Sequence, residues 1–257
     1  GLYIVSTPIG NLKDISERAI NTIKEVDFII CENPSHSLKL LNNFGIKKKL
    51  ISLHDHSELK IIKKVEKQLY EKKVALISDA GSPLISDPGY KLTKYCIDNN
   101  INVTSIPGAN SIIPSLQLSG IPINEFYFAG FFPKSDKKML DFIEKISNLN
   151  ITSVFFVSNN KINICLDIIE KKMNERLVSV SKELTKLNEK TYRGDLQDIK
   201  KNINSEGEKI KGEFVVVVGN NSNRKIDSPD LIEYEHEILK LLSKFSLTDV
   251  VEIVHKL

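Results

Sequence analysis

The stretch "VALISDAGSPLISDPG", residues 74–89, decides the fold. It begins with consecutive apolar residues that show no polar alternation, which is typical of a strand covered on both faces in a parallel sheet. A loop rich in Gly, Pro, Ser and Asp follows, and a helical pattern resumes over residues 90–100. In a parallel α/β sheet, ligands bind at the carboxyl ends of the strands. The stretch therefore predicts a buried strand followed by a loop that lines a ligand site.

The same succession of apolar strand and helical pattern runs through the first half of the chain. The expected strands cover residues 2–7, 27–32, 49–54, 74–79 and 102–107, and the expected helices cover residues 14–26, 37–45, 58–70 and 90–100. Strands that alternate with helices predict a mainly parallel sheet. We expect an α/β domain over residues 1–120.

The second half changes character, because runs of strands do not simply alternate with helices. Expected strands lie at residues 125–132, 152–158, 176–184, 191–193 and 212–220, and expected helices at residues 137–146, 162–173 and 196–203. This order predicts a mixed sheet in a second α/β domain over residues 121–220. The boundary is expected where Gly120 and Pro122 end the preceding helix, and residues 221–257 are expected to form a linker and an amphipathic helical tail.

Composition limits the classes of protein that the chain can belong to. With 257 residues, 41% hydrophobic and 27% charged, it is expected to be a soluble globular protein without a membrane span or signal peptide. Cys31, Cys96 and Cys165 lie far apart in apolar stretches, which predicts reduced core cysteines in a cytoplasmic protein. The net charge of +3 permits an RNA partner without requiring one.

Three loops at predicted strand ends carry the residue types of a ligand site. In residues 77–89, Asp79 stands at a strand tip, where its carboxylate can accept hydrogen bonds from a ribose or an amine. The stretches "STPIGNL" (residues 6–12) and "PGANS" (residues 107–111) end two other strands, and their small residues let a ligand approach the backbone. The alternative is that these residues only begin helices. Neither a G-x-G-x-x-G fingerprint nor a P-loop lysine motif occurs, which disfavours dinucleotide and nucleoside-triphosphate phosphate sites.

The stretch "LHDHSE", residues 53–58, brings His54 and His56 close together. Strand alternation would make them a metal pair, but no third ligand is spaced to complete the site, so no metal is expected. A histidine that faces RNA or a cleft is the favoured interpretation. In the second half, "SKELTKL" (residues 181–187) places Lys182, Glu183 and Lys186 just after a strand, and "KGEFVVVV" (residues 211–218) places Gly212 and Glu213 where a strand begins. By pattern alone, ordinary surface is the favoured interpretation of these residues.

Taken in order, these motifs resemble a known family. They are "TPIGNL", "LHDHSE", "VALISDAGSPLISDPG", "PGANS", "GFFPK", "ELTK", "YRGDL" and "KGEFV". The chain from residue 2 to about residue 220 resembles the ribosomal RNA small-subunit methyltransferase I family, a branch of the tetrapyrrole methylase superfamily. The resemblance implies two α/β domains with S-adenosylmethionine in the cleft between them, and a homodimer. It also implies methyl transfer to the ribose 2′-oxygen of a cytidine in small-subunit ribosomal RNA.

The resemblance also implies roles for individual residues. The cofactor pocket would draw on Pro8, Ile9, Gly10, Asp79, Gly81, Ser82, Ser111, Leu184, Gly212 and Glu213. The base that removes the hydroxyl proton would be one of Glu32, His36 and Glu183, and the sequence does not choose among them. The residues expected to contact RNA are His54, His56, Lys161, Lys182 and Lys186.

Several positions depart from the family pattern. Residues 33–35 are Asn-Pro-Ser where the family has Asp-Thr-Arg, and Val157 stands where it has Glu. Serine cannot make the bidentate phosphate contact of an arginine, whereas Asn33 is a good helix N-cap and Pro34 suits a first helical turn. Three hypotheses follow: an active RNA ribose methyltransferase, a cofactor- and RNA-binding homologue that has lost catalysis, and a methylase of a tetrapyrrole or another small molecule.

Overall fold

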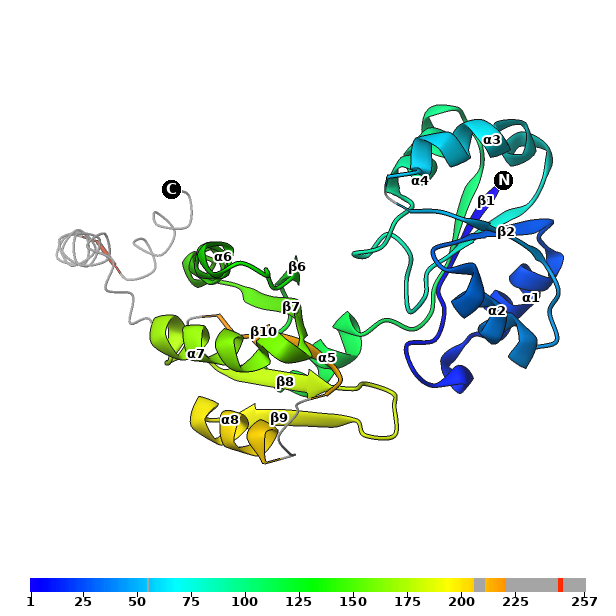
Figure 1. Cartoon of the computed structure of the whole chain (residues 1–257). Coiled ribbons are helices and arrows are strands. Elements are labelled where there is room, and N and C mark those ends of the chain that lie inside the picture. The colour runs from blue at the N-terminus through cyan, green and yellow to red at the C-terminus, as the bar shows by residue number, and fades with distance from the viewer. Residues whose placement is uncertain (55, 206–210, 221–244, 247–257) are drawn as a thin grey trace. The chain divides into compact units, whose positions relative to one another are not determined.

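The computed structural model describes residues 1–54, 56–205, 211–220 and 245–246 (Figure 1). The expected linker and helical tail lie almost entirely outside the described residues, as does Asp55 of the "LHDHSE" stretch. Contacts between Cα atoms divide the chain into one unit over Gly1–Asn220 and another over Asn221–Leu257. Within the described residues, no helix is long and apolar enough to cross a membrane.

The first sheet is parallel throughout, as the unalternating apolar runs predict. Its strands are β1 (Leu2–Val5), β2 (Phe28–Cys31), β3 (Lys49–Ser52), β4 (Val74–Ile77) and β5 (Val103–Ile106), in the order β3-β2-β4-β1-β5. In β4, Val74 and Leu76 enter one core cluster, whereas Ala75 and Ile77 enter another. Both faces of this central strand are therefore buried, which explains its continuous apolar run.

The helices of the first half follow the predicted order, with two shifted boundaries. They are α1 (Glu17–Glu25), α2 (Pro34–Asn43), α3 (Glu58–Glu71), α4 (Tyr90–Asp98) and α5 (Ile112–Ser119), and a short 3-10 helix, η1, covers Leu12–Asp14. The prediction of one helix over residues 14–26 is wrong, because the Ser16 hydroxyl accepts the Ala19 N–H at 3.1 Å and starts α1 separately from η1. Helix α2 begins at Pro34, before the helical pattern at residue 37 but where the predicted cap Asn33 places its start.

The second sheet is mixed, as predicted. Its strands are β6 (Phe126–Phe131), β7 (Thr152–Ser158), β8 (Val178–Lys182), β9 (Lys190–Gly194) and β10 (Glu213–Val218), in the order β6-β7-β10-β8-β9. Strands β6 and β7 are parallel, and the other neighbouring pairs are antiparallel. The helices are α6 (Asp136–Asn148), α7 (Ile162–Met173) and α8 (Leu196–Asn204), with the 3-10 helix η2 (Asn159–Lys161) before α7. Helices α6, α7 and α8 lie along this sheet (Figure 1), and their side chains bury one face of it.

The other face of the second sheet packs against α5. Leu116 of α5 is buried together with Val154 of β7 and Val215 of β10. Thus α5 contributes to the core of the second sheet although it precedes residue 120. The division at residue 120 remains a prediction, and it is at this face that the candidate site lies.

Candidate active site

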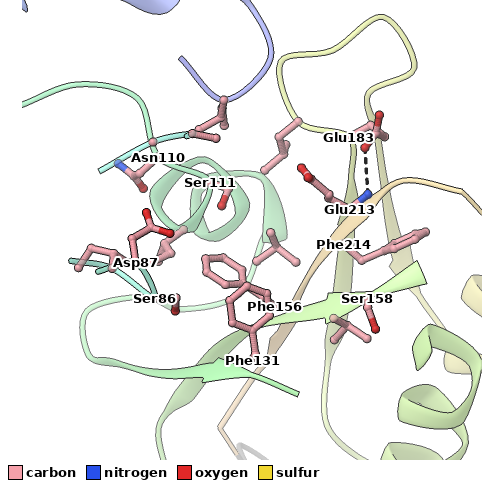
Figure 2. Close-up of a pocket in the computed structure, with 18 of the residues that line it drawn as sticks. Ser86, Asp87, Asn110, Ser111, Phe131, Phe156, Ser158, Glu183, Glu213 and Phe214 are labelled. Atoms are coloured by element: carbon pink, nitrogen blue, oxygen red, sulfur yellow. Dashed lines mark hydrogen bonds between the residues drawn. The ribbon is translucent and has the colours of Figure 1, made fainter. Parts of the chain in front are cut away.

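A cavity of about 650 Å³ is lined by the loops that follow β1, β4 and β5 and by residues of β6, β7, β10 and the turn after β8 (Figure 2). The strand-end loops of the first sheet thus take the place that the sequence predicts for them. Among the predicted cofactor residues, the cavity is lined by Ile9, Asp79, Gly81, Ser82, Ser111, Leu184, Gly212 and Glu213, but not by Pro8 or Gly10. Residues far apart in the sequence therefore meet at one site, and their role in binding a cofactor remains a prediction.

Backbone hydrogen bonds tie the loop after β1 to the loop after β4. The Thr7 N–H donates to the Gly81 carbonyl at 2.9 Å, and the Gly81 N–H donates to the Thr7 carbonyl at 3.1 Å. Gly81 has φ +82°, and a Cβ at this position would lie 3.2 Å from the Cγ2 of Ile9. This close approach favours glycine, so that backbone rather than side chain forms this part of the wall.

Asp79 connects the cavity to the junction between β2 and α2. Its carboxylate is half-buried and accepts the Asn33 backbone N–H at 3.3 Å. The Asn33 side chain in turn accepts the N–H groups of Ser35 at 3.0 Å and His36 at 3.3 Å, which confirms the predicted N-cap. The cap residue Asn33 thus supports Asp79 through its own backbone.

Two of the three predicted bases lie outside the cavity wall. Glu32 is half-buried and His36 is exposed, and neither belongs to the residues that line the cavity. Both flank Asn33, which contacts Asp79, so they lie beside the cavity rather than in it. Their role as a base remains a prediction.

Glu183 does line the cavity, and it is held by several partners. Its carboxylate accepts the Glu213 backbone N–H at 2.9 Å and pairs with the Lys186 ammonium at 3.0 Å, as Figure 2 shows for Glu213. Lys186 also pairs with the Glu213 carboxylate at 3.0 Å. Burial raises the pKa of Glu183, but the hydrogen bonds from Lys186 and Glu213 outweigh it and hold the pKa below its usual value. A carboxylate so stabilised in its charged form is a weak proton acceptor.

The Glu183 carboxylate fits closely against Gly212. That glycine has φ +107°, and a Cβ there would lie 2.7 Å from the Cγ of Glu183. Glu183 itself has φ +50°, a conformation that non-glycine residues seldom adopt. Unusual backbone at both positions indicates that Glu183 shapes the start of β10, where Glu213 enters the cavity wall.

The predicted RNA contacts form no part of the cavity wall. His54 and His56 are exposed, and the His54 Nε2 lies 3.0 Å from the Ser52 hydroxyl. Lys161 lies in η2, and the Lys182 ammonium lies 5.9 Å from the centre of the Phe214 ring. In the described part of the chain, no cluster of three or more His, Cys, Asp or Glu side chains could hold a metal. The RNA role of these residues and of Lys186 stays a prediction.

The sequence interpretation missed the aromatic part of the cavity. Phe131 and Phe156 line it, with ring centroids 5.0 Å apart, and Ser86, Asp87 and Ser158 line it as well (Figure 2). Ser86 and Asp87 belong to the loop that the sequence singled out. Phe131 lies in the "GFFPK" motif and Phe156 in an expected strand, but the sequence interpretation gave neither phenylalanine a role in the site. Gly130 could have indicated the role of Phe131, because an isolated glycine within a strand pattern suggests a β-bulge. A bulge changes the face of the sheet on which the next side chain lies.

Comparisons with known proteins identify the family. The family model of Tetrapyrrole (Corrin/Porphyrin) Methylases matches residues 1–200. The ribosomal RNA small subunit methyltransferase I of Halalkalibacterium halodurans is 40% identical over 87% of this chain and 77% of its own length. The protein of the same name from Rickettsia prowazekii is 36% identical over 100% of this chain and 96% of its own length.

The chain belongs to the ribosomal RNA small subunit methyltransferase I family. A solved structure of diphthine synthase, 16% identical, superposes with a TM-score of 0.65 over 85% of this chain and 89% of its own, and shows the same fold. The chain is therefore a methyltransferase with the tetrapyrrole-methylase fold, a family that generally uses S-adenosylmethionine. The recognition and the fold class expected from the sequence are confirmed.

Proposed function

We propose that the protein transfers a methyl group from S-adenosylmethionine to the ribose 2′-oxygen of a cytidine in small-subunit ribosomal RNA. The observation that carries the proposal is the single cavity that gathers predicted cofactor residues from both halves of the chain. The names of the relatives support the RNA substrate. The ribose 2′-oxygen and the cytidine rest on the motif resemblance.

The residues that line the cavity suit this cofactor. Gly81 and Gly212 both have positive φ, and each contributes backbone rather than a side chain to the cavity wall, which lets a nucleoside approach closely. Asp79 and Glu213 supply carboxylate oxygens that can accept hydrogen bonds from ribose hydroxyls or from the amino group. Their negative charge also complements a sulfonium ion. We infer that these four residues contact the cofactor.

When bound, the cofactor supplies a methyl group on a good leaving group, and the chain's own residues have the tasks of positioning and proton removal. The hydrogen-bonded loops at Thr7 and Gly81 provide a rigid wall against which a ribose hydroxyl can be aligned. Glu183 is the least suited of the three predicted bases, because its ion pair with Lys186 and its lowered pKa favour the charged form. Glu32 and His36 are thus the better candidates for the base.

The assembly and location of the protein are also proposals. We propose that two copies of the chain form a homodimer in the cytoplasm, and that residues 1–120 and 121–220 act as the two domains that enclose the cofactor. Light scattering of the purified protein at several concentrations measures the assembly state. A monomer over the whole range would contradict the dimer.

The function is tested by incubating the purified protein with small ribosomal subunits, naked ribosomal RNA or tetrapyrroles, each with S-adenosylmethionine carrying a labelled methyl group. Mass spectrometry of RNA nucleosides should find label in 2′-O-methylcytidine. Label in a base, or only in a tetrapyrrole, would overturn the proposal. Cofactor binding by calorimetry without transfer to any substrate would instead identify a homologue that has lost catalysis.

A further inference from the structure

The aromatic end of the cavity rests on an irregularity in β6. Phe128 pairs with Val154 of β7, and the next pair joins Phe131 to Phe156. Strand β6 thus advances three residues while β7 advances two, which is the geometry of a β-bulge. Gly130 lies inside it with φ +76°, a conformation that favours glycine.

The bulge decides which face of the sheet Phe131 occupies. In a regular strand, side chains alternate, so Phe131 would share a face with Ala129, which packs on the core beneath α6 and α7. The extra residue reverses the alternation. Phe132 enters that core instead, and Phe131 joins Phe128 and Phe156 on the cavity side. A bulge beside a cavity commonly re-aims a side chain in this way.

The re-aimed ring is open to solvent. Phe131 is 62% exposed although it lines a cavity, and its ring is tilted by 60° against that of Phe156. The pair presents apolar, aromatic surface at the mouth of a site whose other members include Ser86 and Asp87 (Figure 2). Such a surface suits a planar group that arrives from outside, because each of the two rings offers a π face.

The position of the pair separates it from the predicted cofactor residues of the second sheet. Phe131 lies on the edge strand β6, whereas Glu213 lies on β10, two strands away, at a distance of about 10 Å for ordinary strand spacing. Leu184 follows β8, one strand further. Within the second sheet, the cavity thus extends from the aromatic pair on β6 and β7 to Glu213 on β10 and Leu184 after β8.

We propose that Phe131, supported by Phe156, stacks on an unpaired nucleobase of the RNA substrate and places its ribose toward the cofactor end of the cavity. This inference rests on the proposed function and identifies the part of the site that receives the RNA. Proteins that act on single nucleotides stack an unpaired base on aromatic side chains, and such contacts tolerate different bases. Phe131 is therefore a residue that grips the substrate, separate from the cofactor pocket.

The test compares variants of the full chain. Phe131→Ala should lower kcat/KM for small-subunit RNA about tenfold, within the range that base–aromatic stacking supports, while cofactor affinity measured by calorimetry changes less than twofold. Phe131→Leu, which keeps apolar bulk without a ring, should show the same loss, and Phe131→Tyr should restore most of the activity. Phe126→Ala is the matched control, because Phe126 lies on the same strand, is 41% exposed and does not line the cavity.

Several results would overturn the inference. Full activity of Phe131→Ala, or of Phe131→Leu, contradicts stacking while leaving the proposed function intact. An equal loss of cofactor affinity would assign the ring to the cofactor, and a change of assembly state in light scattering would assign it to an interface between copies. If the wild type methylates no RNA, the proposed function fails. The inference about Phe131 is then tested by measuring the affinity of the protein for an rRNA fragment. An affinity of Phe131→Ala equal to that of the wild type would contradict the inference.

Discussion

Glu58 holds the end of the cavity loop, and its replacement provides a quantitative test of the structure. It is the first residue of α3 and only 2% exposed. Its two carboxylate oxygens accept the backbone N–H groups of Gly89 and Lys91, at the start of α4. The buried charge thereby joins two helix starts and fixes the point at which the loop over residues 79–89 ends.

The magnitude follows from these two hydrogen bonds. A hydrogen bond to a charged group contributes about 1.5–3 kcal/mol, and a buried donor left without an acceptor costs about 1–3 kcal/mol. Glu58→Gln keeps the shape of the side chain, but its amide group turns a donor toward one of the two N–H groups. We expect the free energy of unfolding to fall by about 2–3 kcal/mol in Glu58→Gln, and by about 3–5 kcal/mol in Glu58→Ala, which removes both acceptors.

Urea unfolding followed by circular dichroism measures these differences, and hydrogen exchange should show faster exchange at the Gly89 and Lys91 amides. Glu66→Gln is the matched control, because Glu66 lies on the same helix, is exposed and accepts a hydrogen bond from the Tyr95 hydroxyl at 2.7 Å. Its urea midpoint should equal that of the wild type. If Glu58→Gln unfolds within about 0.5 kcal/mol of the wild type, below the contribution of one such bond, the reasoning is refuted.

Three further predictions concern pH, a glycine and the thiols. In the folded protein the pKa of Glu183 lies below its usual value of 4.5. The Glu183 carboxylate therefore stabilises the fold above pH 4.5, and this contribution is lost as the pH falls through the folded pKa. In urea unfolding, the free energy of unfolding of the wild type should accordingly approach that of Glu183→Gln in acid. Gly212→Ala should weaken cofactor binding in calorimetry about tenfold, because its Cβ would displace the Glu183 side chain, whereas Gly45→Ala, with φ +65° and open space around it, should not. Burial raises the pKa of Cys96 to about 11 and that of Cys165 still further, so neither thiol should react with a disulfide reagent at pH 8 until the protein is unfolded.

Each of these predictions has an opposing result. A difference between the wild type and Glu183→Gln that stays constant from neutral to acid pH would contradict the ion pair with Lys186. Equal cofactor affinity of Gly212→Ala and the wild type would show that Glu183 can move without cost to the pocket. Reaction of either thiol in the native protein would contradict its burial.

Continuous apolar runs allowed the strands of the fold to be predicted from the sequence. The runs at residues 74–77 and 214–218 are apolar throughout, which favours strands buried on both faces, and both lie in the interior of their sheets. The loop after β4 was equally accessible, because a long Gly- and Pro-rich connection after such a strand is usually functional. Local patterns of this kind do not depend on what the rest of the chain does.

The parts of the site that escaped prediction depend on contacts between distant segments. Glu58 looks like any helix-starting acid until α4 is placed beside it, and the ion pair of Glu183 needs Lys186 and Glu213 at the same point. The sequence places Phe131 in a strand correctly. However, the regular alternation of side chains along a strand assigns Phe131 to the wrong face of the sheet unless the bulge is known. These features depend on long-range contacts or on strand register, and the hydrophobic periodicity of the sequence contains no information about either.

The cap at the start of α2 has a consequence for anion binding at this helix. A helix N-terminus usually offers free backbone N–H groups to an anion. Among residues 33–37, all of them described, Pro34 has no N–H, and the amides of Ser35, His36 and Ser37 already donate to the side chain or carbonyl of Asn33. The helix thus offers an anion no free amide in its first turn, and a positively charged side chain is the remaining kind of group that could bind a phosphate there.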